Sequence, residues 1–324
     1  MNIPIFFASN EFYIPYVSVM MRSIMENAAK ERKYEFYILH TDIKNETIET
    51  LKKQISLFSD FSLNFVDMSQ CIKDYDFFVS RRITIETYFR LFIPYIFPNF
   101  EKILYFDCDM VCLTDISRLF NTDISNYLVG GVRDYSGLLT YYCPKWKRKR
   151  KWVKVEEVLL SMKHPENYIN AGMLLINCEK FRKTYTIQYM FDTICSRKWQ
   201  SHDQDVINLL AKDKILYFDY EWNYRIDPAP FIKYFPEIHR NKYAEAQKNP
   251  KIIHYKPYSC WWYLPHFEFF WKYATRTPFV NEIIARMNKN GIIEKIDIKD
   301  KFCIKVKEKI MTIAILSKIL RRQF

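Results

Sequence analysis

The sequence predicts an α/β protein with a mainly parallel sheet flanked by helices. Short apolar runs alternate with helical patterns through residues 1–100, which is the order of elements in proteins of this class. Hydrophobic residues make up 49% of the 324 residues, enough to build a substantial core around such a sheet. One apolar run ends directly in two aspartates, and ligands of these sheets bind beyond the carboxyl ends of the strands. The loops after the strands are therefore where chemistry is expected.

The expected elements follow one another in order. In the first half, helices are expected at residues 14–28, 45–58 and 87–96, and strands at residues 3–8, 34–39, 63–66 and 102–106. Pro15 suits the first turn of its helix, and Asn45 is the expected N-cap of the next one. The second half is less regular, with strands expected at residues 129–133, 171–177, 216–219 and 252–255. From about residue 302 the chain has the pattern of a basic, apolar helical tail.

Asp107 and Asp109 follow the strand at residues 102–106, with Cys108 between them. In an extended chain, residues two apart point the same way, so both carboxylates face one cation while Cys108 turns into the core. Clustered carboxylates are costly unless a metal or protonation neutralises them. His254 also follows a short apolar strand, and two aspartates with one histidine suit Mn²⁺ (or Mg²⁺) better than Ca²⁺. Because the sequence has no glycine-rich phosphate loop, a bound diphosphate must be held in another way.

Two further segments carry candidate residues with open alternatives. The triplet Asp203-Gln204-Asp205 heads a helix, where acidic residues also serve as caps and favour the helix dipole. The triplet Asn170-Ala171-Gly172 precedes an apolar strand in a chain with only five glycines. Gly172 therefore indicates either close approach of the backbone to a ligand or a simple turn.

The positive charge is unevenly distributed along the chain. There are 49 lysines and arginines against 37 aspartates and glutamates, and residues 301–324 alone hold seven cationic side chains against one glutamate. A second cluster runs through residues 145–151, beside Trp146 and Trp152. Such patches suit anionic lipid, phosphorylated substrates or nucleic acid. In the tail, apolar positions alternate with cationic ones, which favours a membrane-surface helix over a solvated or oligomerising one. Nothing else indicates a nucleic-acid module, so nucleic acid is not an expected partner.

The cysteines and the N-terminal sequence indicate a cytoplasmic protein. The eight cysteines are scattered and form no C-x-x-C pair, so free thiols are expected. The first residues include no basic region of the kind that opens a signal peptide, and no apolar stretch approaches the length of a membrane-spanning helix.

The order of these motifs resembles glycosyltransferase family 8, which includes glycogenin and the bacterial lipopolysaccharide galactosyl- and glucosyltransferases. The resemblance runs from about residue 3 to residue 279. It rests on a set of motifs that follow one another in a fixed order, and this set is more specific than any single motif in it. It comprises FFASNEFY, TYFRL, LYFDCDMV, GGVRDY, NAGMLLIN, HDQDVIN, EWNY, IIHY and FFWKYATRTPF. It implies a GT-A fold at residues 1–279. Residues 280–324 are expected to form a C-terminal helical extension, and the charge pattern of its last part, 301–324, predicts association with a membrane. The resemblance also implies a UDP-hexose donor and a product that retains the anomeric configuration.

The resemblance assigns roles to individual residues. It implies that Asp107, Asp109 and His254 are Mn²⁺ ligands, with Asp107 also facing the donor. The positions where the family holds uridine are Ala8, Asn10 and Tyr13. Arg90 matches an arginine beside the donor phosphates and sugar. The residues that match contacts to the donor sugar or its hydroxyls are Asn170, Ala171, Gly172, Asp203, Gln204 and Asp134.

The sequence departs from the family pattern in two places. After the first strand, Glu11 and Phe12 partly replace an Asn/Asp pair. In HYKPYSCWW, Cys260 replaces a lysine that touches phosphate, and Pro257 replaces a glycine. Lys256 is the candidate to supply the missing phosphate contact, although its spacing differs.

The expected function is transfer of glucose or galactose from a UDP-hexose to a glycan or glycolipid acceptor. The acceptor would be a lipopolysaccharide core or capsular polysaccharide, and the enzyme would lie on the inner face of the plasma membrane. Gln204 is a poor nucleophile, which favours front-face substitution with Asp203 orienting the sugar. Three alternatives remain open: a catalytically silent UDP-sugar-binding protein, a metal-dependent nuclease, and an inverting transferase with Asp134 as base.

Overall fold

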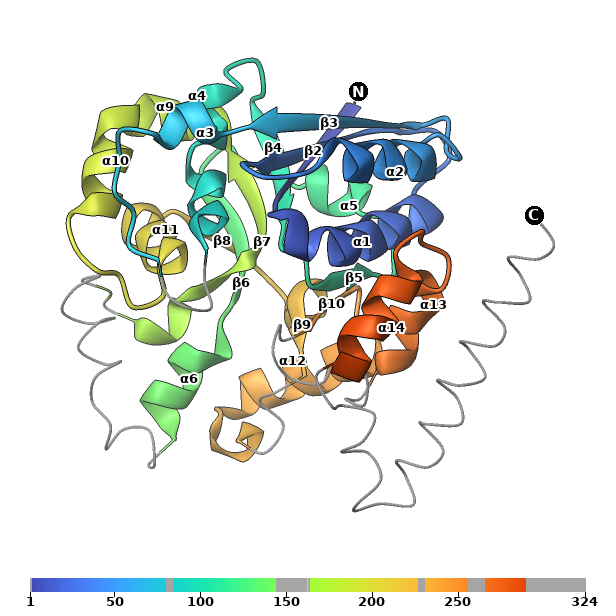
Figure 1. Cartoon of the computed structure of the whole chain (residues 1–324). Coiled ribbons are helices and arrows are strands. Elements are labelled where there is room, and N and C mark those ends of the chain that lie inside the picture. The colour runs from blue at the N-terminus through green and yellow to red at the C-terminus, as the bar shows by residue number, and fades with distance from the viewer. Residues whose placement is uncertain are drawn as a thin grey trace.

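The computed structural model describes residues 2–79, 84–143, 162, 164–226, 231–255 and 266–289. Within this part of the chain, helices cover both faces of a central sheet, and a smaller sheet lies below it in the view of Figure 1. The basic run at 145–151 and the tail at 301–324, with its expected helix, lie outside the described residues.

The central sheet has seven strands in the order β3-β2-β1-β4-β7-β6-β8. Their bounds are β1 Asn2–Ala8, β2 Lys33–His40, β3 Phe61–Asp67, β4 Lys102–Phe106, β6 Val129–Arg133, β7 Ile169–Asn177 and β8 Ile215–Phe218. The pairs β1–β2, β2–β3, β1–β4 and β6–β8 are parallel, whereas β7 runs antiparallel to β4 and β6. The expectation of a mainly parallel sheet is confirmed, with β7 as the reversed strand.

The sheet separates two buried apolar clusters. In β1, Ile3, Ile5 and Phe7 belong to one cluster, and Phe6 and Ala8 to the other, because successive side chains of a strand point to opposite faces. The helices that pack into the first cluster are α1 Ile14–Asn27, α2 Asn45–Ile55, α5 Ser117–Phe120, α6 Tyr135–Tyr142, α12 Glu237–Lys248, α13 Phe267–Ala274 and α14 Val280–Lys289. Those on the other face are α3 Ser69–Ile72, η2 Ile85–Leu91, α4 Ile93–Ile96, α9 Cys178–Thr184, α10 Ile187–Cys195 and α11 Asp203–Ala211.

The smaller sheet has three strands in the order β5-β10-β9. Their bounds are β5 Met110–Cys112, β10 Ile252–His254 and β9 Tyr224–Arg225. β10 pairs with β5 so that His254 lies opposite Met110, one residue beyond Asp109. This pairing brings His254 beside the turn that follows β4. Short turns of 3-10 helix complete the described fold at η1 Glu11–Tyr13, η4 Pro165–Asn167, η5 Tyr220–Asn223 and η6 Ile232–Tyr234.

Three of the expected elements differ from the structure. The helix expected at 87–96 is a 3-10 turn, η2, followed by a short helix, α4. Pro94 explains the break, since it has no N–H to continue a helical ladder and instead lies in the first turn of α4. Asn45 is the first residue of α2 rather than its N-cap, which is Lys44. β7 begins at Ile169, so the candidate sugar residues lie inside the strand and not before it.

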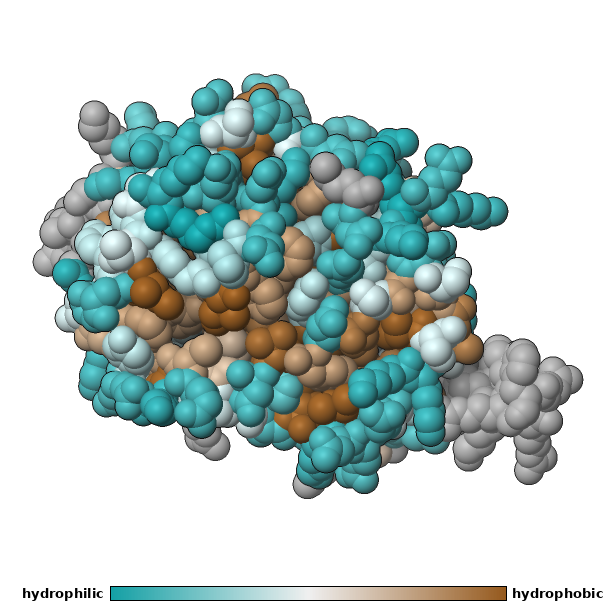
Figure 2. Space-filling model, turned by 90° about the horizontal axis from the view of Figure 1, so that it is seen from above, coloured by the Kyte–Doolittle hydropathy of each residue, from teal (hydrophilic) through white to brown (hydrophobic). Residues whose placement is uncertain are grey.

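The C-terminal part of the described chain packs onto the main fold. Val280 and Ile283 of α14 are fully buried in the apolar cluster that also contains the buried side chains of α1. In the described residues, no helix combines the length and apolarity needed to cross a bilayer. Seen from above, hydrophilic side chains surround a band of apolar surface (Figure 2). The six described cysteines are free thiols, as expected.

Candidate functional site

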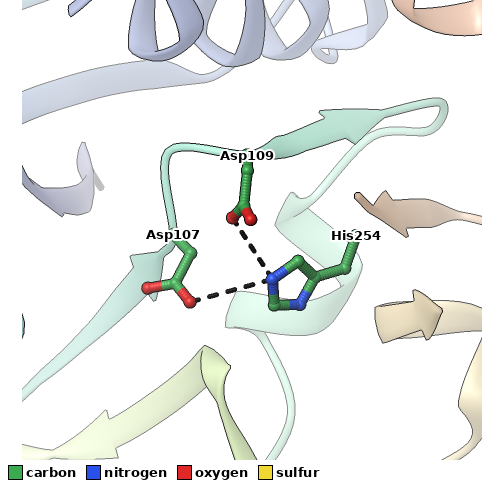
Figure 3. A group of neighbouring side chains, drawn as sticks. All are labelled: Asp107, Asp109 and His254. Atoms are coloured by element: carbon green, nitrogen blue, oxygen red, sulfur yellow. Dashed lines mark ion pairs between the residues drawn. The ribbon is translucent and has the colours of Figure 1, made fainter. Parts of the chain in front are cut away.

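Asp107, Asp109 and His254 converge on one point. The aspartates lie in the turn between β4 and β5, and His254 ends β10, so that the three side chains point toward one another (Figure 3). Nε2 of His254 lies 3.2 Å from Oδ1 of Asp109 and 3.8 Å from Oδ2 of Asp107. Each residue offers one ligand atom within 4.8 Å of the others. Cys108 points away, with its Sγ 3.2 Å from the carbonyl oxygen of Ala8 at the end of β1. The two carboxylates therefore share one side of the turn, as predicted.

The surroundings of this cluster fit a divalent cation. Two carboxylates and one imidazole form a mixed oxygen and nitrogen donor set of the kind that Mn²⁺ takes. Asp109 and His254 are only 7% and 8% exposed, so both are held away from water. A Cβ on Gly172 would lie 2.5 Å from Cε1 of His254 and 2.8 Å from Oδ2 of Asp107. Glycine is required there because any side chain would push against His254 and Asp107, which shows a close approach of the backbone to these side chains rather than a simple turn.

Arg90 contacts three of the other candidate residues. Its Nη2 lies 2.9 Å from Oδ1 of Asp107, and its Nε lies 3.0 Å from Oδ2 of Asp203. Nη1 donates to the carbonyl oxygen of Ala171 at 2.5 Å, and the guanidinium stacks over the ring of Tyr105. Arg90 is 5% exposed; burial opposes its charge, but the two carboxylates raise the pKa of Arg90 above its usual value. The arginine therefore remains charged and orients both acids.

Asp203 is a buried acid rather than a helix cap. It begins α11, but its Oδ1 accepts from Thr87 at 2.5 Å and its Oδ2 pairs with Arg90. Burial raises the pKa of Asp203 to about 6, against the opposing effects of Arg90 and Thr87. Asp205 instead holds the start of the helix, accepting from the backbone N–H of Ser201 at 2.7 Å. Of the two acids, Asp203 thus faces the site.

The amides of Asn170 and Gln204 are held in one arrangement. Oε1 of Gln204 accepts from the backbone N–H of Ala171 at 3.0 Å and from Nδ2 of Asn170 at 3.0 Å. Nδ2 of Asn170 also donates to Oδ2 of Asp134 at 2.9 Å, and that carboxylate pairs with Arg225 at 3.1 Å. The structure therefore brings the expected sugar-contacting residues together, with Asp134 buried in an ion pair.

The loop after β1 lies beside the aspartate turn. Oδ1 of Asn10 accepts from the backbone N–H of Tyr13 at 3.3 Å and so begins η1. Tyr13 is half-buried, whereas Phe12 is 54% exposed. Glu11 turns away toward α2, where it accepts from Thr47 at 2.7 Å and from the backbone N–H of Lys44 at 3.1 Å. Glu11 therefore supports the start of a helix. Lys256, the remaining candidate, lies outside the described residues, as do Pro257 and Cys260.

Asn223 is a residue of the site that the sequence alone did not assign. Its Oδ1 lies 2.9 Å from Nδ1 of His254, and its Nδ2 donates to Oδ1 of Asn170 at 2.9 Å. Asn223 lies in the EWNY motif, but this motif does not indicate which residues Asn223 contacts in the fold.

The arrangement of the sheets and helices is the GT-A fold, which the chain shares with solved glycosyltransferases. The profile described as "Glycosyl transferase family 8" matches residues 4–263, and the chain belongs to this family. Glycosyltransferase GlyA of Streptococcus pneumoniae is 26% identical over 79% of this chain, which spans only 34% of GlyA. Lipopolysaccharide 1,2-glucosyltransferase of Escherichia coli is 24% identical over 80% of this chain and 73% of its own length. The crystal structure of galactosyltransferase LgtC with donor and acceptor sugar analogs superposes with a TM-score of 0.68 at 21% identity, covering 85% of this chain and 96% of LgtC.

Proposed function

We propose that this protein is a retaining, metal-dependent hexosyltransferase that moves glucose or galactose from a UDP-hexose to a glycan acceptor. The observation that carries the proposal is the convergence of Asp107, Asp109 and His254 next to the buried cation of Arg90. A lipopolysaccharide core or a capsular polysaccharide is the proposed acceptor class. The similarity to a lipopolysaccharide 1,2-glucosyltransferase supports that class.

Asp107, Asp109 and His254 are the proposed ligands of Mn²⁺ or Mg²⁺. When bound, the cation supplies positive charge that stabilises the departing diphosphate. Arg90 keeps Oδ1 of Asp107 occupied, which leaves its Oδ2 on the side of His254. The proposed uridine contacts are Ala8, Asn10 and Tyr13, and Lys256 is the proposed phosphate contact.

The proposed sugar pocket consists of the residues around the start of β7 and α11. Asp203 and Arg90 would orient the hexose and the phosphates, with contacts from Asn170, Ala171, Gly172, Gln204 and Asp134. The carbonyl oxygen of Gln204 already accepts two hydrogen bonds, which supports front-face substitution over a covalent intermediate on this residue. The ion pair between Asp134 and Arg225 supports a retaining rather than an inverting reaction, because an inverting enzyme needs an available carboxylate base.

We also propose that residues 301–324 attach the enzyme to the cytoplasmic face of a membrane. The support is compositional: seven cationic side chains alternate with apolar ones, and each cation near anionic lipid contributes about 1 kcal/mol. The proposal includes no nucleic-acid partner.

The anomeric configuration of the product tests the proposed reaction. The wild-type protein is incubated with Mn²⁺, UDP-glucose or UDP-galactose, and a panel of lipopolysaccharide core oligosaccharides, and the new linkage is assigned by NMR coupling constants. An α-linked product from the α-linked donor supports retention. A β-linked product would refute it, and Asp109→Asn serves as the control that should form no product.

A further inference from the structure

We propose that Asn223 is a positioning residue that sets which nitrogen of His254 faces the metal and orients the amide of Asn170. The inference rests on the proposed function, because both partners belong to the proposed donor and metal site. Asn223 is the last residue of η5, immediately before β9, and is 4% exposed. Its amide is therefore removed from water, and its two ends must find partners within the protein.

The amide of Asn223 bridges the two halves of the site. Its Oδ1 lies 2.9 Å from Nδ1 of His254 on β10, and its Nδ2 lies 2.9 Å from Oδ1 of Asn170 on β7. The parallel pairing of β9 with β10 places Tyr224 opposite Ile253 and Arg225 opposite His254, so Asn223 comes directly before the strand that lies beside His254. A single side chain thus touches a proposed metal ligand and a proposed sugar contact.

The direction of each hydrogen bond follows from one backbone group. The N–H of Gly172 can only donate, and it lies 3.0 Å from Oδ1 of Asn170, so this oxygen is an acceptor. The atom of Asn223 that faces it must then be the NH₂ group, which leaves the carbonyl oxygen facing His254. An acceptor at that place requires the proton of His254 on Nδ1. Nε2, the nitrogen 3.2 Å from Asp109, is therefore the one available to a cation.

Backbone N–H groups also fix the directions of the hydrogen bonds on the other side of Asn170. The N–H of Ala171 fixes Oε1 of Gln204 as an acceptor, and Nδ2 of Asn170 donates to it and to Oδ2 of Asp134. Both ends of the Asn170 and Asn223 amides therefore have a partner of the right kind. Without Asn223, the proton of His254 is free to move to Nε2, where it would block the metal.

The first test measures Mn²⁺ binding by calorimetry in the full chain. Asn223→Ala is expected to weaken Mn²⁺ binding about 10–100-fold, the range for residues that orient a metal-bound histidine. Asn223→Asp keeps an acceptor for Nδ1 of His254 but loses the donor to Asn170. It should hold Mn²⁺ within about threefold of wild type while raising the KM for the donor. If Asn223→Ala binds Mn²⁺ like wild type, or if both variants lose binding equally, the inference is overturned.

A spectroscopic readout separates positioning from simple loss of structure. In metal-free protein with ¹⁵N-labelled histidine, long-range NMR spectra report which ring nitrogen of His254 carries the proton, with His254→Gln identifying the signal. Wild type should show the Nδ1–H form and Asn223→Ala a mixture; an Nε2–H form in wild type would overturn the inference. Asn177→Ala is the matched control, since Asn177 is a buried amide at the opposite end of β7 that caps α9. If wild type itself binds neither Mn²⁺ nor UDP, the proposed function fails and not merely the role of Asn223.

Discussion

Nη2 of Arg90 lies 2.9 Å from Oδ1 of Asp107, so a buried cation holds one of the carboxylates that face His254. The same guanidinium pairs with Asp203 and bonds to the backbone of Ala171. Arg90 therefore ties the turn after β4, the start of β7 and the start of α11 into one rigid unit. The stability of the fold and the geometry of the proposed metal site therefore both depend on the side chain of Arg90.

Replacement of Arg90 by methionine should destabilise the protein by about 3–5 kcal/mol, because Asp107 and Asp203 lose their shared counter-charge. Urea unfolding monitored by circular dichroism measures the change. Arg90→Lys retains the charge but not the several directed hydrogen bonds, so a smaller loss is expected. Equal stability of Arg90→Met and wild type would contradict this role.

Asp203 predicts a pH dependence of stability. Burial raises the pKa of Asp203 to about 6 in the folded protein, above its ordinary value near 3.8. The folded state therefore binds this proton more tightly than the unfolded state, so the contribution of Asp203 to stability falls as pH rises from about 4 through 6. Asp203→Asn should lack this pH-dependent contribution. The free energy of unfolding of the variant, relative to that of wild type, should therefore increase as pH rises from about 4 through 6. Urea titrations at several pH values test it; parallel profiles would show that Asp203 has an ordinary pKa.

Gly172→Ala should weaken Mn²⁺ binding about tenfold or more, because the added Cβ meets Cε1 of His254 and Oδ2 of Asp107. Calorimetric titration with Mn²⁺ measures this effect. Gly131→Ala is the matched control: its Cβ would meet Cδ1 of Ile169 in the apolar core at 2.8 Å, away from the ligands. The control should lose stability but keep its Mn²⁺ affinity, and the prediction is wrong if both variants bind Mn²⁺ equally.

Glu11→Ala should cost about 1 kcal/mol of stability without changing Mn²⁺ affinity, because Glu11 accepts from the backbone N–H of Lys44, the N-cap of α2, and from the hydroxyl of Thr47. Glu46→Ala removes an acidic residue from the same first turn and should cost less. Thermal and urea unfolding compare the two. A loss of UDP binding in Glu11→Ala, with stability unchanged, would instead place this residue in the nucleotide site.

Much of the sheet could be predicted from the sequence because its strands are continuous apolar runs. The strand at 102–106 was predicted with its observed bounds, and the aspartates after it pointed to a metal. The start of β7, predicted at residue 171, was placed two residues late because Asn170 interrupts the apolar pattern, although Ile169 and Asn170 lie in the strand.

The partners within the site could not be predicted from local patterns. His254 reaches the aspartates through the pairing of β10 with β5, two strands of three residues each that are too short to show a period. The contacts of Arg90 with Asp203, and of Asn223 with Asn170 and His254, join segments far apart in the chain. Such pairs depend on the three-dimensional arrangement of the strands and are visible only in the folded structure.

The most direct test of the central claim is release of UDP from UDP-glucose and UDP-galactose, with and without Mn²⁺, in wild type and Asp109→Ala. We expect wild type, in the presence of a core oligosaccharide, to release UDP from one of the two donors only when Mn²⁺ is present. Asp109→Ala should release none. Release that is equal in the variant, or that needs no divalent cation, would contradict the metal site. Absence of any UDP binding by wild type would contradict the proposed transferase as a whole.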